Sequence, residues 1–428
     1  MTRSSLTYLG HARAVCLTGF CLNFTYAIAY SHICLGAALA FLAAEWYLLR
    51  PSRLSAADRF VYRLCGVFVA LCALSAVVND TPLQSLSVLR EEWLFLLVPL
   101  VVFTVKNPRH RNWVVGGALL STAALALYGW LQRWLGFNLR PELPLDFGPD
   151  GFYRASGAFH NTLTYGNLFA LLSILFLVRA VFESRPRWRY ACALTGALAL
   201  GATVFSYGRG PILGVSIGLL VFFVFALRRN WKVSLGSLAV LVALIAIFSP
   251  GIFGRFAQGF RLETEQYETA REKSSSRMTI WRTSARVVAD NPLFGVGAGN
   301  FESAYREHAD SDVVRFFTHA HNDLLNISAY AGIPATLAYL GLWVAVLWRL
   351  YRAARAGRGW AAAALAASVT FLVCSLTEAT FADEEVRAGL MLVWGLGLAE
   401  ASATEPTDSQ SIMRDRTVAA NENTPRAV

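Results

Sequence analysis

The sequence predicts an all-α, polytopic integral membrane protein with about twelve transmembrane helices and one large, partly helical loop outside the cytoplasm. Of the 428 residues, 55% are hydrophobic and only 15% are charged, and the mean hydropathy is +0.44. The apolar residues occur in long runs, and Lys and Arg cluster in the short segments between these runs. This composition excludes a soluble protein of several domains.

The length of each apolar run sets the predicted membrane spans. A spanning helix needs about twenty mainly apolar residues, because each residue rises ~1.5 Å and the hydrocarbon core is ~30 Å thick. The first run is followed at once by a second and lacks a cleavage site, so we expect a retained helix and not a signal peptide. The predicted spans lie near residues 14–30, 32–49, 61–78, 93–105, 113–134, 162–182, 190–206, 211–227, 233–249, 322–348, 360–378 and 388–402.

Arg and Lys predict the sidedness, since basic residues in short loops are retained in the cytoplasm. We therefore expect both termini in the cytoplasm and the 250–321 segment outside, because a segment of this length crosses regardless of its charge. The net charge of +10 then reflects topology and not nucleic-acid binding. Basic residues of the cytoplasmic loops include Arg50, Arg53, Lys106, Arg109, Arg185, Arg187, Arg228, Lys232, Arg349 and Arg352, whereas the opposite short loops hold little beyond Arg90, Arg209 and Arg387.

This topology divides the chain into four parts. Residues 1–249 form nine transmembrane helices, interrupted by an irregular outer loop at 133–160 that is rich in Pro, Gly and Asp. Residues 250–321 form the large outer loop, and residues 322–402 form helices ten to twelve. We expect the polar tail, residues 403–428, to be a disordered cytoplasmic segment.

Arginines in the outer loops are the first candidates for a functional site. A serine at 274–276 can cap a helix that runs to about Asp290, which places Arg277 in its first turn. An arginine there opposes the helix dipole unless an anion binds beside it. Arg282 lies on another face of this helix, and for either residue the alternative is a solvated surface side chain.

Two further arginines lie in other outer loops. Arg209 is flanked by Tyr207-Gly208 and Gly210-Pro211 in a short turn between two spans. A charge near hydrocarbon depth usually faces a cavity or a partner, and the alternative is a side chain that reaches the interface. Arg154 has a similar place in a longer loop, so the same reasoning applies to it less strongly.

His319 and His321 precede the tenth span, next to Asn322 and Asp323. Imidazole titrates near neutral pH, so a general base is chemically natural, while a metal ligand and a helix cap are the alternatives. All seven cysteines lie in apolar runs, and no Cys-x-x-Cys or His-Glu-x-x-His pattern supports a metal or a disulfide framework. Asp323 also has an ordinary role as a carboxylate in the first turn of a helix.

These residues carry a family resemblance. His321-Asn322, followed after nine residues by Gly332, is similar to the His-[Asn/Ser/Gln]-x9-Gly pattern of the O-antigen ligase family, membrane enzymes of lipopolysaccharide synthesis. The segments 290–297, 207–210 and 154–159 also resemble that family, and the likeness covers about residues 150–340. Ala335 departs from the pattern, which prefers Gly, Thr or Tyr there. The superfamily also contains O-antigen polymerases and protein O-oligosaccharyltransferases.

The resemblance implies transfer of an O-antigen polysaccharide from undecaprenyl diphosphate to a sugar hydroxyl of lipid A–core, at the periplasmic face of the bacterial inner membrane. A diphosphate leaving group needs cations, which Arg209 and Arg277 can supply, and the acceptor hydroxyl needs a base, for which His321 is the candidate. Arginine would make a divalent metal or other cofactor unnecessary, and direct attack would invert the anomeric carbon. The remaining substrate-binding candidates are Arg154, Arg282, His319, Asn322 and Asp323.

Two kinds of alternative remain open. A polymerase or a protein O-oligosaccharyltransferase of the same superfamily would use the same cations and base. A lipid-linked glycan transporter would also explain twelve spans, but it predicts charged or broken helices near the bilayer midplane. In this sequence the suggestive residues gather at one face instead.

Overall fold

The computed structural model describes residues 3–49, 56–140, 142, 144–148, 150–223, 274 and 276–402. In this part of the chain every regular element is a helix, apart from one antiparallel bridge between Phe147 and Tyr153, so the predicted all-α class is confirmed. The elements are α1 (Arg3–Asn23), α2 (Ile28–Leu49), α3 (Ala56–Val78), α4 (Pro82–Leu89), the 3-10 helix η1 (Arg90–Leu96), α5 (Leu97–Val105), α6 (Pro108–Leu135), α7 (Thr162–Phe182), α8 (Pro186–Phe205), a helix over Arg209–Phe223, α12 (Arg277–Asp290), α13 (Phe301–His308), α14 (Asp323–Arg355), α15 (Gly359–Ser375) and α16 (Glu384–Ser402).

Five of the described helices, α2, α3, α6, α7 and α14, are long and apolar enough to cross a membrane, and two shorter apolar helices accompany them. The chain is therefore a multi-pass membrane protein, while the total of twelve spans stays a prediction. The predicted ninth span, 233–249, lies outside the described residues, as do the first part of the large loop and the tail.

The first predicted span, 14–30, is displaced in the structure. α1 ends at Asn23 and α2 begins at Ile28, so a turn falls inside an apolar run. The Asn23 side-chain amide donates to the Gly19 carbonyl at 2.6 Å, and the Asn23 carbonyl accepts the amides of Tyr26 and Ala27. These local bonds end the helix where hydropathy alone predicts that it continues.

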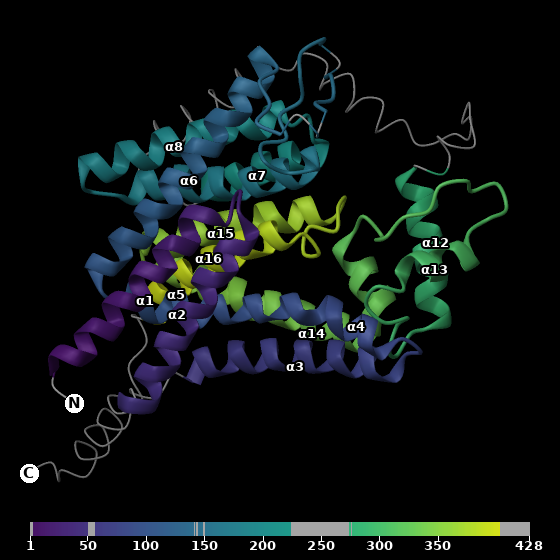
Figure 1. Ribbon diagram of the computed structural model, residues 1–428, viewed down its shortest axis with the longest axis horizontal. Helices are drawn as coiled ribbons and strands as arrows, with labels where there is room; N and C mark the ends of the chain where they lie inside the picture. The colour runs from purple at the N-terminus through teal and green to yellow at the C-terminus, as the bar shows by residue number, and fades with distance from the viewer. Residues whose placement is uncertain are drawn as a thin grey trace, which may run out of the picture.

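The helices form a bundle in which α15 and α16 lie between a group made of α6, α7 and α8 and a group made of α3 and α14 (Figure 1). α7 packs against α8, α15 and α16, and most of its side chains are buried. α14 packs against α3 and α15, and α16 packs against α5. Packing in this buried apolar centre fixes the positions of the helix ends. The polar residues of the candidate site lie at those ends.

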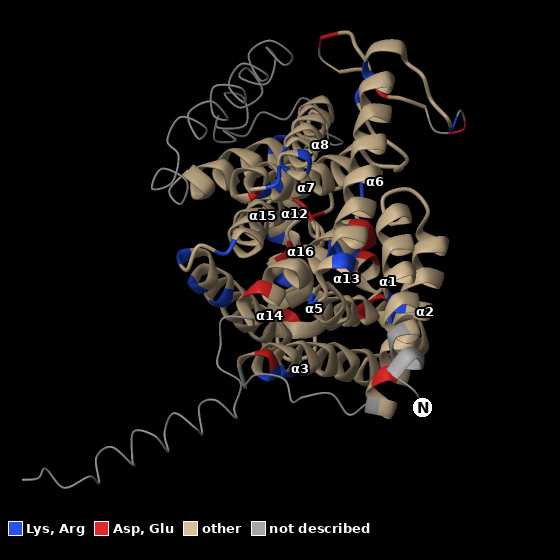
Figure 2. Ribbon diagram, turned by 90° about the vertical axis from the view of Figure 1, so that its left-hand side faces the viewer, with Lys and Arg blue, Asp and Glu red and all other residues tan. Residues whose placement is uncertain are grey.

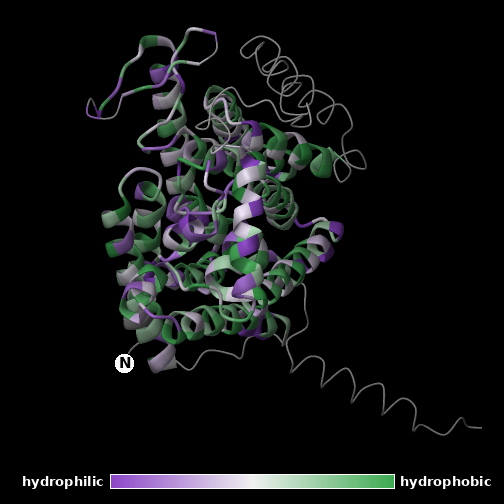
Figure 3. Cartoon of the chain, turned by 90° about the vertical axis from the view of Figure 1, so that its right-hand side faces the viewer, coloured by the Kyte–Doolittle hydropathy of each residue, from purple (hydrophilic) through white to green (hydrophobic). Residues whose placement is uncertain are grey.

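Basic loops and polar outer segments lie at opposite ends of the bundle. At one end Arg185, just before α8, donates to Asn112 of α6 at 3.3 Å, and the Arg179 guanidinium of α7 lies 5.0 Å from the Trp360 ring centroid of α15, so helix ends next to the basic loops meet there. Figure 2 looks onto this end, and Lys and Arg are visible around it. Figure 3 looks onto the opposite end, where α12 and α13 lie and hydrophilic colours are in front of the green helices.

The large loop packs against the bundle at a break in α14. Gly332 has a φ of 83°, and the Ile333 amide donates to the Pro292 carbonyl at 2.8 Å. A Cβ at Gly332 would collide with the Leu293 carbonyl, so glycine is required for this close approach. The Val296 amide donates to the Ala329 carbonyl at 2.8 Å on the other side of the break. Two of the family-like segments, 290–297 and 321–332, therefore pack against each other at this break.

Candidate active site

Three of the four predicted arginines line one pocket at the outer end of the bundle. Arg154, Arg209 and Arg277 come from the loop before α7, the start of the Arg209–Phe223 helix and the start of α12. The cavity is ≈ 370 Å³, and its wall also contains Asn167, Tyr207, Gly208, Thr377 and Glu378. We call it the arginine pocket. It gathers permanent positive charge and the first residues of two helices, an arrangement suited to an anion.

Arg277 is positioned by the local sequence around Ser276. The Ser276 side chain accepts the Thr279 amide at 3.3 Å, so the predicted helix cap is confirmed and Arg277 is the first residue of α12. Its Nη2 donates to Oε2 of Glu378 at 3.2 Å. Burial lowers the pKa of Arg277, which Glu378 opposes and Arg209 reinforces. The guanidinium is thus paired with a carboxylate in a pocket that also contains a second guanidinium.

A buried arginine fixes the loop that carries Arg154. Arg133 pairs with Asp150, and its guanidinium lies 4.6 Å from the Phe152 ring centroid and 5.3 Å from that of Tyr207. Arg154 in turn donates through Nη2 to the Ser206 carbonyl at 3.0 Å. These contacts attach the loop before α7 to the turn that precedes Arg209, although the two segments are far apart in sequence.

Glu378 connects the arginine pocket to the predicted base. His321 Nδ1 lies 2.6 Å from Oε1 of Glu378, while Oε2 accepts from Arg277. Burial raises the pKa of Glu378, but the hydrogen bond and charge of His321 and the charge of Arg277 outweigh it, so the pKa is lowered overall. An ionised carboxylate only accepts hydrogen bonds, so Nδ1 of His321 donates to Glu378, and Nε2 is the ring nitrogen that remains for proton transfer.

His321 and its neighbour His319 differ in environment. Nε2 of His321 is buried and has no hydrogen-bond partner among the described residues, and its ring lies 5.3 Å from that of Phe317. His319 Nδ1 accepts the His321 amide at 3.3 Å. Burial, with help from His321, lowers the pKa of His319 to about 4, so His319 is neutral at physiological pH.

Backbone conformation singles out the same region. Tyr207 and His321 have φ values of 56° and 50°, and among the described residues no other non-glycine residue has a positive φ. Such conformations cost about 1–3 kcal/mol and persist where surrounding contacts enforce them, often at functional sites. Here Trp281 Nε1 donates to the His321 carbonyl at 3.4 Å and fixes that residue from α12.

His319, His321 and Glu378 are also the residues that could hold a metal ion. One ligand atom from each lies within 4.8 Å of the others, and two imidazoles with a carboxylate are a donor set that suits zinc. However, His321 Nδ1 is already at hydrogen-bond distance from Glu378, and a divalent cation there would lie next to Arg277. Hydrogen bonding therefore accounts for this geometry without a metal.

The structure separates the other predicted residues. Arg282 is exposed on α12 and does not line the arginine pocket. The Asn322 side chain accepts the Leu325 amide at 3.1 Å and donates to the Leu376 carbonyl at 3.0 Å, so it begins α14 and holds the segment after α15. Asp323 is buried and accepts the Phe381 amide at 3.0 Å and the Thr380 hydroxyl at 3.1 Å. Both residues position the 376–383 segment.

Sequence reasoning missed Glu378, although a signal was present. The segment Leu376-Thr377-Glu378 ends an apolar run that was assigned as the span 360–378, whereas α15 ends at Ser375. A carboxylate at the end of such a run is a functional candidate by the same argument that selected Arg209. Its partners come from α12 and from the segment before α14, so only the structure identifies them.

Comparisons with known proteins agree with the resemblance. Residues 194–340 match the family model described as O-antigen ligase, a stretch that contains Arg209, Arg277 and His321. The chain is also similar to the teichuronic acid biosynthesis protein TuaE of Bacillus subtilis (strain 168), with 28% identity over 193 residues. That match covers 43% of this chain and 38% of the relative, so the chain matches well under half of that protein's length. Both matches support a relationship of this chain to the O-antigen ligase superfamily, and the family model covers the part of the chain that carries the predicted base and two of the arginines.

Proposed function

We propose that this chain, which carries an O-antigen ligase domain over residues 194–340, transfers O-antigen polysaccharide from undecaprenyl diphosphate to a sugar hydroxyl of lipid A–core. One observation carries the proposal. Three guanidinium groups line a single pocket, and Glu378 in its wall holds the imidazole of His321. Leaving-group stabilisation and base catalysis, the two requirements of this reaction, thus belong to one site.

In the proposed reaction the donor diphosphate binds in the arginine pocket. Its negative charge is matched by Arg154, Arg209 and Arg277, and by backbone amides at the start of the Arg209–Phe223 helix. As the bond between the anomeric carbon and the diphosphate oxygen breaks, charge accumulates on the leaving group, and guanidinium groups stabilise it without a metal. Undecaprenyl diphosphate then leaves as the anion.

Proton transfer is assigned to His321. The acceptor hydroxyl attacks the anomeric carbon while Nε2 of His321 takes its proton, and Glu378 stabilises the imidazolium through Nδ1. Attack opposite the leaving group inverts the anomeric carbon. Because Nε2 is buried beside Phe317 and His319, we expect these rings to move aside when the acceptor enters.

The proposed setting is the bacterial inner membrane, with the site facing the periplasm and both termini in the cytoplasm. The separation of basic loops from α12 and α13, at opposite ends of the bundle, supports this orientation. In this assignment the four-part division of the chain and the twelve spans are retained as proposals.

Polymerisation of lipid-linked glycan is the second candidate, because a polymerase would use the same cations and base and the chain is also similar to a protein of teichuronic acid biosynthesis. Deletion of the gene distinguishes the two on a lipopolysaccharide gel. Loss of a ligase leaves complete core without O-antigen while lipid-linked polymer accumulates. Core that carries a single repeat would instead assign the chain as a polymerase and contradict ligation.

A further inference from the structure

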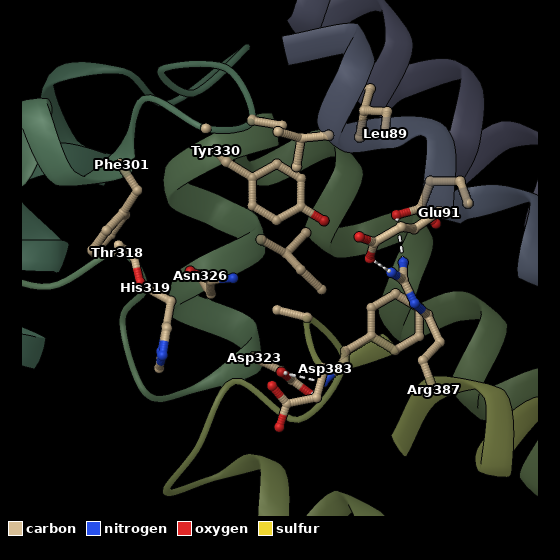
Figure 4. Close-up of a pocket in the computed structure, with 17 residues that line it drawn as sticks. Leu89, Glu91, Phe301, Thr318, His319, Asp323, Asn326, Tyr330, Asp383 and Arg387 are labelled. Carbon is tan, nitrogen blue, oxygen red and sulfur yellow. Dashed lines mark hydrogen bonds and ion pairs between the residues drawn. The ribbon is translucent and has the colours of Figure 1, made fainter. Parts of the chain in front are cut away.

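A second pocket shares the 376–383 segment with the arginine pocket. Glu378 lines the arginine pocket, whereas Asp383, five residues later, lines the second one. The second cavity is ≈ 280 Å³ and lies between η1, α14 and the start of α16 (Figure 4). His319 is in its wall, and the His319 and His321 ring centroids are 4.1 Å apart. A molecule in this pocket would contact His319, whose ring packs against that of the proposed base.

The charge of this second pocket is opposite to that of the arginine pocket. Its wall contains the carboxyl groups of Glu91, Glu92, Asp323 and Asp383, with Arg387 as the single Arg or Lys. Burial raises the pKa of Asp383 to about 7, so this group is only partly ionised at neutral pH, and the negative charge comes mainly from Glu91 and Glu92. Arg387 is already engaged by Glu91 and Glu92, at 2.6 and 2.8 Å. We call this cavity the acidic pocket. A phosphate group would meet unfavourable charge here, whereas the arginine pocket attracts it.

Its polar atoms are arranged for a ligand that bears hydroxyl groups. Asn326 is 7% exposed, its Oδ1 accepts the Ala320 amide at 3.2 Å, and Figure 4 places its side-chain amide nitrogen toward the cavity. Oε2 of Glu92 is buried and has no partner among the described residues. One Asp383 oxygen accepts the Thr164 hydroxyl at 2.9 Å. The pocket thus offers a buried donor beside carboxylate acceptors.

Aromatic side chains complete the wall. Phe381 and Tyr330 both line the cavity, and the Tyr330 hydroxyl points toward the side where Glu91 lies (Figure 4). Apolar ring faces beside a few placed polar groups are typical of small-molecule sites, and the volume is at the lower end of their usual range, roughly 300 Å³. One ring fits this space better than an extended oligosaccharide.

We propose that the acidic pocket binds the acceptor as a single sugar ring that carries no phosphate, so that its hydroxyl reaches His321 from the side opposite the donor diphosphate. This inference rests on the proposed function and adds the acceptor class to it. Charge separates the two substrates: the diphosphate belongs in the arginine pocket, and a hydroxyl-rich neutral or amino sugar belongs in the acidic pocket.

Binding of simple sugars to the purified full-length protein in nanodiscs tests this, with methyl glucoside, glucosamine and glucose 6-phosphate as probes in saturation-transfer NMR. We expect the first two to bind at least ~tenfold more tightly than glucose 6-phosphate. Asn326→Asp keeps the acceptor for the Ala320 amide but removes the donor, and it should weaken methyl glucoside ~tenfold. Asp383→Asn should narrow the discrimination against glucose 6-phosphate.

Asp310→Asn is the matched control, because that carboxylate is exposed and pairs with Arg286 away from both pockets. Undecaprenyl diphosphate binding, measured on the same samples, distinguishes failure of the acceptor assignment from failure of the proposed function. Both pocket variants should keep it, and its absence in the unmodified protein would overturn the proposed function. Equal binding of glucose 6-phosphate, no binding of any sugar, or unchanged sugar binding in both variants would overturn the acceptor assignment alone.

Discussion

Replacement of Glu378 by Gln tests whether the carboxylate orients the imidazole of His321 and stabilises its protonated form. The side chain is only 7% exposed, and it accepts from His321 Nδ1 at 2.6 Å and from Arg277 at 3.2 Å. Gln has the same shape and keeps an acceptor oxygen but lacks the charge. Hydrogen bonds to charged groups contribute about 1.5–3 kcal/mol, and each 1.4 kcal/mol is a factor of ten, so we expect kcat to fall roughly 10- to 150-fold.

The assay is transfer of labelled glycan from lipid-linked donor to acceptor by purified protein, with kcat and the donor KM measured across pH. Glu302→Gln is the control, because that exposed carboxylate pairs only with Arg306 among the ion pairs of the described residues and should change kcat less than twofold. A Glu378→Gln enzyme with unchanged kcat and pH profile, beside an inactive His321→Ala enzyme, would refute the reasoning.

Four further outcomes follow from the same geometry. Arg209→Ala and Arg277→Ala should each lower kcat/KM for the donor at least ~tenfold. Arg306→Ala, which removes an exposed ion pair, should leave kcat/KM within twofold. Equal losses in all three variants would indicate that only the overall positive charge of the outer face matters. Asp323→Ala leaves the Phe381 amide and Thr380 hydroxyl unpaired and should destabilise the fold by about 2–4 kcal/mol in denaturation, with Asp290→Ala near zero. Because the folded pKa of His319 is about 4, below its ordinary value, the unfolded chain binds more protons, so stability should fall as pH drops from ~6.5 toward 4; His319→Gln should flatten that part of a thermal-shift profile, and an unchanged slope would contradict it. EDTA should not abolish transfer, and complete inhibition reversed by added zinc would assign His319, His321 and Glu378 as metal ligands.

The sequence predicted the residues whose chemistry is unusual in their local surroundings. Arg209 and Arg154 lie next to apolar spans, and Arg277 follows a helix cap, so a few neighbouring residues are enough to identify each arginine as a candidate. The structure places all three in one pocket. Their roles as catalytic or binding residues stay predictions, as does the role of His321.

The remaining features depend on contacts between distant segments. The proposed role of Glu378 depends on its contacts with His321 and Arg277, which lie 57 and 101 residues away in the sequence. Gly332 was part of a recognised pattern, but its function as a break in α14 depends on the Leu293 carbonyl that packs against it. Hydropathy likewise merged α1 and the following turn, because the bonds of Asn23 are local geometry that an average over twenty residues does not detect.

The most direct test of the central claim is transfer by the purified protein in nanodiscs, with undecaprenyl-diphosphate-linked glycan and lipid A–core as the only substrates. We expect glycan joined to core and free undecaprenyl diphosphate to form in equal amounts, and His321→Ala to stop both while donor binding persists. Equal product from His321→Ala, or release of undecaprenyl diphosphate with glycan joined only to another glycan, would contradict it.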